Sequence, residues 1–540
     1  MLRQLLTVSL IFTGGPCLIP ASPASGAESE LSTTEFIDQQ ITQAWVDNNV
    51  RPSTSADEEE WVRRVYLDIA GRIPSLQETT AWLDDDTSRR RTILIDSLLE
   101  TTDYVRNFTT IWTNECIGRG ISRRVSRSGM EKFFRDVFAK NRPWNDVVRD
   151  LITAEGHFEE NGAVNYILAQ TQMNDDAVQL TARTTRLFLG QQVQCTQCHN
   201  HPFNDWKQSQ FWQFNSFFRQ VRRIDRRRQD PSSGRPVDDY SEIVLGPFNG
   251  PVYFETRNGL MHVAFPELQG RKVDPDDSDR RAKLGRMLVE PVDGETPQIA
   301  RAFVNRMWAH FFGYGFTRPV DDMGPHNPAS HPDLLNRLSA DFVAAGYDVK
   351  ELIRWIARSQ AYSLTSRMEE YNEIDNPSAG EMPLFSHAYV KSMQAEQLYD
   401  SLIVATNAHQ SGNDPWDTQE QQRQRWMQQF IVAFDNDEND ETTTFNGTIP
   451  QALMLMNSEL TDKAVSVEAG SFLHQVLSQS GSDRKKLQQL YLAALSRRPT
   501  RNEISRLQRQ FQSYGRDGRV AAFQDLFWAL LNSNEFILVH

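Results

Sequence analysis

The sequence predicts a mainly α-helical protein, with two helical domains joined by a connector that holds a small β-hairpin or sheet. At 540 residues the chain is too long for one compact core, so at least two domains are expected. Apolar residues recur at helical spacing over most of its length. Loop-forming Pro, Gly and Asp residues and short strand-like runs interrupt this pattern between 229 and 285. We therefore expect helical domains at 28–228 and 286–540, joined by the connector 229–285.

The helices of the first domain are predicted from apolar spacing and from end signals. Residues 35–48 place apolar side chains three and four positions apart. Ser75, followed three residues later by Glu78, forms the capping-box pattern of a helix start. A further helix over 175–194 leads directly into the segment CTQCHNHPFNDW at 195–206.

A phenylalanine-rich stretch after this segment predicts one more helix, with a basic end. Its apolar face is marked by Phe211, Phe214, Phe218 and Val221. Arginines follow at three- and four-residue steps, at Arg219, Arg222, Arg223, Arg226 and Arg227. We interpret them as a solvated helix end that is favourable near the C-terminal dipole, with a contact surface for an acidic partner as the alternative.

In the connector, a short dipeptide signals a hairpin. Asn258 and Gly259 stand between two strand-like runs, the pattern of a tight β-turn. In the second domain, residues 297–315 predict a helix that Gly313 ends. Ser330 is expected to cap the start of the next helix.

The helix at 297–315 also carries polar and aromatic residues on one face. Arg301, Asn305 and Trp308 share that face by their spacing. We expect a buried polar network that holds the helix in place, with a binding site as the alternative.

Residues 1–27 have the pattern of a secretory signal peptide. Arg3 gives a positive start, an apolar run follows, and small residues including Ala27 suit cleavage before Glu28. The apolar run is too short and too broken to span a bilayer, and no later stretch approaches a transmembrane span. We therefore expect a protein exported to the periplasm or the cell exterior, without a transmembrane anchor.

Charge and cysteine content narrow the function further. Removing residues 1–27 takes away one Arg and no acidic residue, so the net charge of −14 becomes −15. An acidic exported protein is a poor candidate for nucleic-acid binding. The mature chain would keep Cys116, Cys195 and Cys198, and an odd number of cysteines cannot all pair within one chain.

Common catalytic signatures are missing from the sequence. It contains no G-x-S-x-G elbow, no H-E-x-x-H, no P-loop and no G-x-G-x-x-G, so it identifies no catalytic residue and does not decide whether the protein is an enzyme. The acidic run DNDENDE at 435–441 lacks the sixth-position Gly of an EF-hand loop and predicts a solvated loop. His326 and His331, which frame HNPASH, are expected to make local hydrogen bonds, with a metal role as the alternative.

The segment C-T-Q-C-H has the spacing of a covalent haem c site. Cys195 and Cys198 are spaced to reach the two vinyl groups of haem, and His199 is placed to bind the iron from the proximal side. Export agrees with this interpretation, because haem of this type is attached outside the cytoplasm. The distal ligand is unknown, and the candidates, which spacing does not rank, are Met173, His201 and His331.

Two other interpretations of the motif stay open. Structural zinc usually takes a second ligand pair further along the chain, and here Cys198 and His199 are adjacent, which makes shared tetrahedral coordination awkward. A disulfide between Cys195 and Cys198 is the other alternative, although no thioredoxin-like βαβ pattern surrounds the pair.

Long stretches of the sequence resemble a known pair of domains. RVYLDIAGRIPSLQETTAWL, RTTRLFLGQQVQCTQCHNHPFNDW and FWQFNSFF resemble a planctomycete-type exported domain, domain of unknown function 1549, also called a planctomycete cytochrome-type domain. ARAFVNRMWAHFFGYGFTRPVDDMGPHNPASHPDLLNRLSADFV, TIPQALMLMNSEL and WALLNSNEF resemble its habitual partner, domain of unknown function 1553. The resemblance covers nearly all of the mature chain and brings no catalytic residue with it.

Two functional hypotheses result. The leading one is an exported c-type-cytochrome-like protein, with electron transfer or a haem-dependent redox role and a redox partner protein. The alternative is a non-redox exported binding or scaffold protein, in which the Cys195–Cys198 pair is a disulfide or a metal clip holding zinc.

Overall fold

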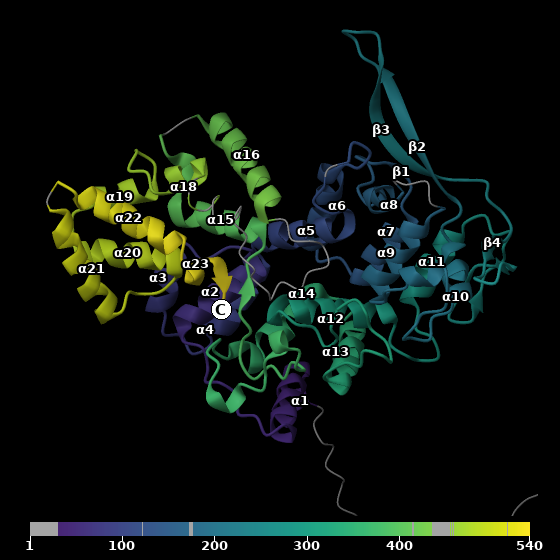
Figure 1. Ribbon diagram of the computed structural model, residues 1–540, viewed down its shortest axis with the longest axis horizontal. Coiled ribbons are helices and arrows are strands. Elements are labelled where there is room, and N and C mark those ends of the chain that lie inside the picture. The colour runs from purple at the N-terminus through teal and green to yellow at the C-terminus, as the bar shows by residue number, and fades with distance from the viewer. Residues whose placement is uncertain are drawn as a thin grey trace, which may run out of the picture.

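Helices form most of the chain, and the sheets among the described residues have two or three strands, which confirms the predicted mainly α fold (Figure 1). The computed structural model describes residues 31–540 apart from 121, 172–175, 413–414, 435–453, 455, 457 and 516. The predicted signal peptide, Met173 and the acidic run at 435–441 lie outside these residues. In the part described, no helix is long and apolar enough to cross a membrane.

Ten α-helices precede the connector among the residues that the structure describes. They are α1 (Thr33–Asp47), α2 (Glu58–Val65), α3 (Leu76–Asp84), α4 (Arg90–Leu99), α5 (Thr102–Ile117), α6 (Arg127–Ala139), α7 (Trp144–Thr153), α8 (Val164–Gln170), α9 (Val178–Leu189) and α10 (Gln208–Asn215). The predicted capping box is confirmed at α3, where the Glu78 backbone donates to Ser75 Oγ at 3.3 Å and the Ser75 backbone donates to Glu78 Oε2 at 2.7 Å. The end of α2 continues as a single π-helical turn, Tyr66–Ala70.

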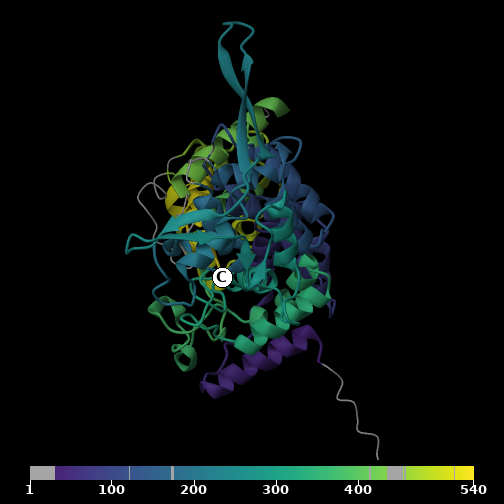
Figure 2. The same ribbon diagram turned by 90° about the vertical axis from the view of Figure 1, so that its right-hand side faces the viewer.

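The connector holds most of the β-structure. Strand β2 (Val221–Gln229) begins eight residues before the predicted connector, inside the predicted first domain. The strands that follow are β3 (Pro236–Leu245), β4 (Val252–Glu255), β5 (Met261–Ala264), β6 (Glu267–Leu268) and β7 (Arg271–Lys272), and β1 (Gly156–His157) adds to the edge of β3. The β2–β3 ribbon projects beyond the helices (Figures 1 and 2). The predicted hairpin at Asn258–Gly259 is confirmed, since β4 and β5 pair in antiparallel register and Gly259 takes a φ of 79°.

The basic helix end predicted after the phenylalanine-rich stretch is wrong. The helix α10 ends at Asn215, and Arg222, Arg223, Arg226 and Arg227 lie on strand β2 instead. The physical reason lies in the facing strand, because β3 brings carboxylates opposite the arginines. Among the ion pairs across the ribbon are Arg226–Glu242, Arg227–Asp238 and Arg228–Asp239. Carboxylates of the same chain therefore pair with arginines for which the sequence had suggested an acidic partner protein as the alternative.

The chain after the connector is helical again. Its helices are α11 (Arg280–Val289), α12 (Gln298–Phe312), α13 (Pro332–Ala344), α14 (Val349–Ala357), α15 (Ala395–Thr406), α16 (Trp416–Phe434), α18 (Glu459–Ala464), α19 (Phe472–Ser478), α20 (Asp483–Leu495), α21 (Arg501–Tyr514), α22 (Arg519–Leu531) and α23 (Asn534–Ile537), with a small sheet of β8 (Lys391–Ser392) and β9 (Leu538–Val539). Gly313 ends α12 at a φ of 86°, as predicted. The cap of α13 is His331 rather than Ser330, because Pro332 takes the first helical position.

The polar network predicted on α12 centres on Asn305. Its fully buried amide donates to Thr317 Oγ1 and to the Val320 carbonyl, both at 2.8 Å, and its oxygen accepts from the Phe316 backbone at 2.7 Å. Arg301 instead bonds Asn336 at the surface side of the helix. Asn305 therefore fixes the loop that follows α12, as a buried polar residue with all its partners does.

Apolar packing divides the chain near residue 390. One cluster of buried side chains runs from Ile37 to Tyr389 and includes helices from both sides of the connector. The second runs from Met393 to Val539 and includes Leu67 and Ile73 from the first domain. The two sequence domains therefore share a core, and the last third of the chain builds its own.

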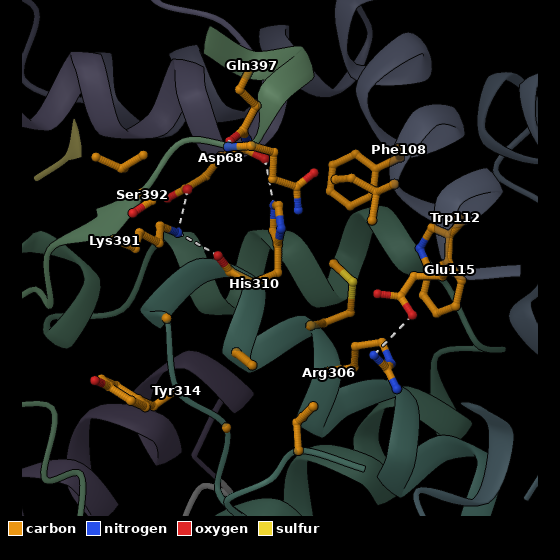
Figure 3. Close-up of a pocket in the computed structure, with 18 of the residues that line it drawn as sticks. Asp68, Phe108, Trp112, Glu115, Arg306, His310, Tyr314, Lys391, Ser392 and Gln397 are labelled. Carbon is orange, nitrogen blue, oxygen red and sulfur yellow. Dashed lines mark hydrogen bonds and ion pairs between the residues drawn. The ribbon is translucent and has the colours of Figure 1, made fainter. Parts of the chain in front are cut away.

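A buried ion pair joins these parts (Figure 3). Lys391 Nζ donates to Asp68 Oδ1 at 2.6 Å and to the last carbonyls of α12, those of His310 and Phe311. Tyr362 donates to the other Asp68 oxygen at 2.7 Å. Burial lowers the pKa of Lys391, and the Asp68 carboxylate opposes that effect. Each charged group thus has its partners, which a buried pair requires.

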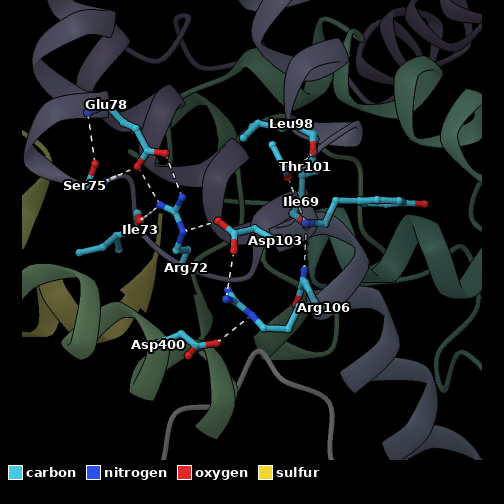
Figure 4. Close-up of polar contacts among 12 residues, drawn as sticks. Ile69, Arg72, Ile73, Ser75, Glu78, Leu98, Thr101, Asp103, Arg106 and Asp400 are labelled. Atoms are coloured by element: carbon cyan, nitrogen blue, oxygen red, sulfur yellow. Dashed lines mark hydrogen bonds and ion pairs between the residues drawn. The ribbon is translucent and has the colours of Figure 1, made fainter. Parts of the chain in front are cut away.

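A second, more open network lies nearby (Figure 4). Arg72 holds Glu78 at 2.8 Å and Asp103 at 2.7 Å, and Arg106 connects Asp103 to Asp400 on α15. Burial would raise the pKa of Glu78, but hydrogen bonding and charge from Arg72 hold it below its usual value. The capping box of α3 is thereby tied to the second core.

Breaking the buried pair should be costly. We expect Asp68→Asn and Lys391→Met each to lower the free energy of unfolding by about 3 kcal/mol, because each leaves the other group without its counter-charge. Urea unfolding would measure both. The double variant should lose clearly less than the sum, and strict additivity would show that the two groups are not coupled.

The shared core predicts how the nicked protein behaves. Mild proteolysis should cut first at the exposed tip of the β2–β3 ribbon, residues 231–235, and the two fragments should still elute together in size-exclusion chromatography. Adding urea should separate them. First cuts inside α12, or fragments that part without denaturant, would contradict this.

Candidate functional site

The two cysteines of the C-T-Q-C-H motif lie on one short turn at the surface. Gly190 ends α9, and a 3₁₀ turn at Gln194–Gln197 follows. Thr196 is fully buried and its hydroxyl donates to the Val193 carbonyl at 2.6 Å, which pins the middle of the turn inward. Cys195 and Cys198 are exposed, free thiols. The turn therefore leaves both cysteines exposed at the surface.

His199 has one ring nitrogen committed and the other available. Its Nδ1 lies 2.7 Å from the Asn200 carbonyl oxygen. A carbonyl oxygen only accepts, so Nδ1 carries the proton and neutral His199 keeps a lone pair on Nε2. Metal-binding histidines commonly have this arrangement, with the other ring N–H on a backbone carbonyl.

Helix α10 and the β4–β5 hairpin support the turn from one side. Gln208 Nε2 donates to the Gln197 carbonyl at 3.1 Å and to the Glu255 carbonyl at 2.9 Å. Trp212 Nε1 also donates to Gln197, at 3.1 Å, and its ring stacks on Phe254 of β4. The connector thus fixes the C-terminal end of the turn.

The second domain supports the turn from the other side, through the segment DDMGPH at 321–326. Asp321 pairs with Arg186 on α9 and accepts from Gln192 Nε2 at 2.7 Å. The Met323 backbone donates to the Gly190 carbonyl at 2.7 Å. A Cβ on Gly190 would lie 2.8 Å from Met323 Sδ, so this close approach needs glycine.

Two histidines from different domains meet beside the motif. The rings of His201 and His326 have centroids 5.6 Å apart, and His326 Nε2 lies 3.1 Å from Asp322 Oδ2. Burial lowers the pKa of His201, and His326 adds to this effect. The sequence singled out His326 for its spacing to His331, whereas its neighbour in space is His201. Nothing in the local sequence signals that pairing.

The candidates for a distal ligand have different surroundings. His201 Nδ1 accepts from the backbone N–H groups of Phe203 and Asn204, at 3.2 and 3.0 Å, which leaves the ring proton on Nε2 and makes His201 a poor ligand in this conformation. His331 is buried against Phe316 and Phe385. Met173 lies outside the described residues.

The third cysteine, Cys116, lies apart from the motif in sequence, and its environment differs from that of the exposed pair. Cys116 is buried at 1% exposure on α5, and burial raises the pKa of its thiol. Burial also raises the pKa of Cys195. Among the residues that the structure describes, no three His, Cys, Asp or Glu side chains are grouped so that they could hold a metal ion. A metal ion bound by Cys195 and Cys198 would therefore need further ligands from outside the residues that the structure describes.

His331 should make the fold sensitive to acid. Burial lowers its pKa from 6.5 to about 4, so between these values only the unfolded chain takes up the proton. Its contribution to stability is full above pH 6.5 and is lost as the pH falls toward 4. From pH 7 to pH 5 the free energy of unfolding of the native protein should fall by about 2 kcal/mol more than that of His331→Gln, measured by urea unfolding. Equal losses would contradict the buried, neutral state.

Family comparisons place the motif and its support in two different domains. The model of domain of unknown function 1549, named as a planctomycete cytochrome-type domain, matches residues 36–223, and that of domain of unknown function 1553 matches residues 280–511. No curated protein and no solved structure matches the chain. The C-T-Q-C-H turn falls in the first match and the DDMGPH segment in the second. The chain therefore belongs to the proteins in which domain of unknown function 1549 is followed by domain of unknown function 1553.

Proposed function

We propose that the protein is an exported, c-type-cytochrome-like protein that carries haem c at the C-T-Q-C-H turn. Cys195 and Cys198 would hold the porphyrin through thioether bonds, and His199 would bind the iron. The observation that carries the proposal is the combination of two exposed thiols on one turn with a histidine whose Nε2 lone pair is available. Haem bound there supplies a one-electron redox couple.

The residues around the turn would serve this role by holding it still. Gln208 and Trp212 fix the Gln197 carbonyl, and Asp321 fixes the segment before Cys195 through Gln192. A rigid turn keeps the thiols and the imidazole in one mutual geometry, which reduces the ordering that attachment demands. The surface position leaves the site within reach of a redox partner protein.

A second candidate function is a non-redox scaffold whose Cys195–Cys198 pair forms a disulfide or a metal clip. What favours it is the position of the turn, which lies between the connector and the second domain. A disulfide there would close the turn itself, and so would hold rigid the surface that the connector and the second domain pack against. The two candidates differ in what is bound to the thiols, so they can be separated directly.

Covalent haem is the decisive test. Protein expressed with its own N-terminus in a strain that matures c-type cytochromes should show a Soret band and retain haem through a denaturing gel. Cys195→Ser and Cys198→Ser should each weaken or abolish that retention, because each removes a tether. His199→Ala should keep the haem attached and change the spectrum, because it removes an axial ligand.

The controls separate attachment from folding and export. Cys116→Ala removes a buried thiol that is not part of the C-T-Q-C-H turn and should retain haem as the native protein does. N-terminal sequencing should find a start near Glu28, and an intact Met1 on cytoplasmic protein would remove the basis for export. Colourless protein from a competent strain would reject the haem proposal. Stoichiometric zinc, or a mass two hydrogens below the reduced form, would then support the scaffold.

A further inference from the structure

A cavity lies where the first domain, α12 and the β8–β9 sheet meet (Figure 3). Its volume is about 170 Å³, and its lining includes Phe108, Trp112, Glu115, Arg306, Tyr314 and Ser392. An engineered cavity of about 150 Å³ holds a benzene ring. The space therefore admits one six-membered ring.

Two polar atoms of the wall have no partner in the folded chain. Trp112 Nε1 and Ser392 Oγ are buried and have no hydrogen-bond partner among the described residues. The Trp112 ring packs against Trp144 and Phe303, with centroids 4.2 and 5.4 Å away, and this contact fixes the direction of its N–H. Buried groups without a partner are rare because they cost stability, and a ligand that bonds them would recover that cost.

The charged groups of the wall balance one another. Arg306 Nη1 lies 3.3 Å from Glu115 Oε2, and its other terminal nitrogen lies 4.0 Å from Asp321 Oδ2. Elsewhere in the wall, Asp68 and Lys391 form an ion pair with each other. A charged ligand would disturb these pairs, whereas a neutral ligand with hydroxyl groups can accept from Arg306 and donate to Glu115.

The apolar part of the wall is aromatic. Phe108 and Tyr314 are both almost fully buried, at 1% and 4% exposure, and both line the cavity. Their rings offer contact to the C–H groups of a ligand. Pockets that combine aromatic walls with a few fixed polar groups are typical of small-molecule sites.

We propose that this cavity binds a neutral, polyhydroxylated six-membered ring, such as a single pyranose. The ring carbons lie among the aromatic side chains, and hydroxyl groups bond Trp112 Nε1, Ser392 Oγ and the Arg306–Glu115 pair. The site is separate from the C-T-Q-C-H turn, so it stands whether or not haem is attached there.

Calorimetric titration of the full chain tests the proposal. The probes are methyl β-D-glucopyranoside, methyl β-D-galactopyranoside and myo-inositol, with glucuronate and benzyl alcohol as the charged and apolar comparators. At least one neutral probe should bind more tightly than both comparators. Trp112→Phe and Ser392→Ala should each weaken its binding about five- to tenfold, the loss expected for one hydrogen bond.

Matched variants show whether the effect belongs to the cavity. Trp61→Phe is the control, because Trp61 is equally buried and its Nε1 also lacks a partner, yet it does not line the cavity. It should bind the probe as the native protein does. Ser392→Ala should stay as stable as the native protein, since the hydroxyl it removes has no partner. The proposal is overturned if no neutral probe binds, or if none binds more tightly than the two comparators. Equal binding of the probe by Trp112→Phe and Trp61→Phe also overturns it.

Discussion

The buried pair of Asp68 and Lys391 is the contact on which the arrangement of the chain depends. Asp68 comes from the π-helical turn after α2, and Lys391 begins the sheet that leads into the second core. The same ammonium group bonds the last carbonyls of α12, which would otherwise be unpaired at the end of a helix. One cation therefore fixes the end of α12, the Asp68 carboxylate and the start of the segment that leads into the second core. A buried charge tolerates few alternative arrangements, so the pair favours this one over other packings of the same helices.

The supports of the C-T-Q-C-H turn follow the same logic at smaller scale. Gln208 of α10 holds one end and is itself tied to the Glu255 carbonyl of the connector, and the second domain holds the other end through Asp321 and Met323. No segment near the motif in sequence could supply both. The turn is consequently a property of the two domains together, and a first domain expressed alone would lack half of its supports.

Features of the fold that rest on local backbone chemistry could be predicted, and features that rest on distant partners could not. The capping box at Ser75, the turn at Gly259 and the helix stop at Gly313 each depend on a few neighbouring residues, and each is confirmed. The arginines of β2 led to a wrong prediction because their three- and four-residue steps fit a helix, while the carboxylates that pair with them across the ribbon follow more than ten residues later. At the site, the grouping of Cys195, Cys198 and His199 could be predicted from their spacing in the sequence. The meeting of His201 with His326 was not, because it joins positions 125 residues apart whose contact exists only once both domains have packed.

The shared core has a consequence for how the chain is made. The helices before the connector bury their apolar faces against α11 and α12, so a ribosome must synthesise well past residue 300 before the first core can close. The ion pair of Asp68 forms later still, because its partner Lys391 must first be synthesised and leave the ribosome. The export that we propose would benefit from such a delay, because translocation machinery threads polypeptides that have not yet collapsed. The distribution of contacts along the chain thus delays closure of the first core until more than half of the chain has been made.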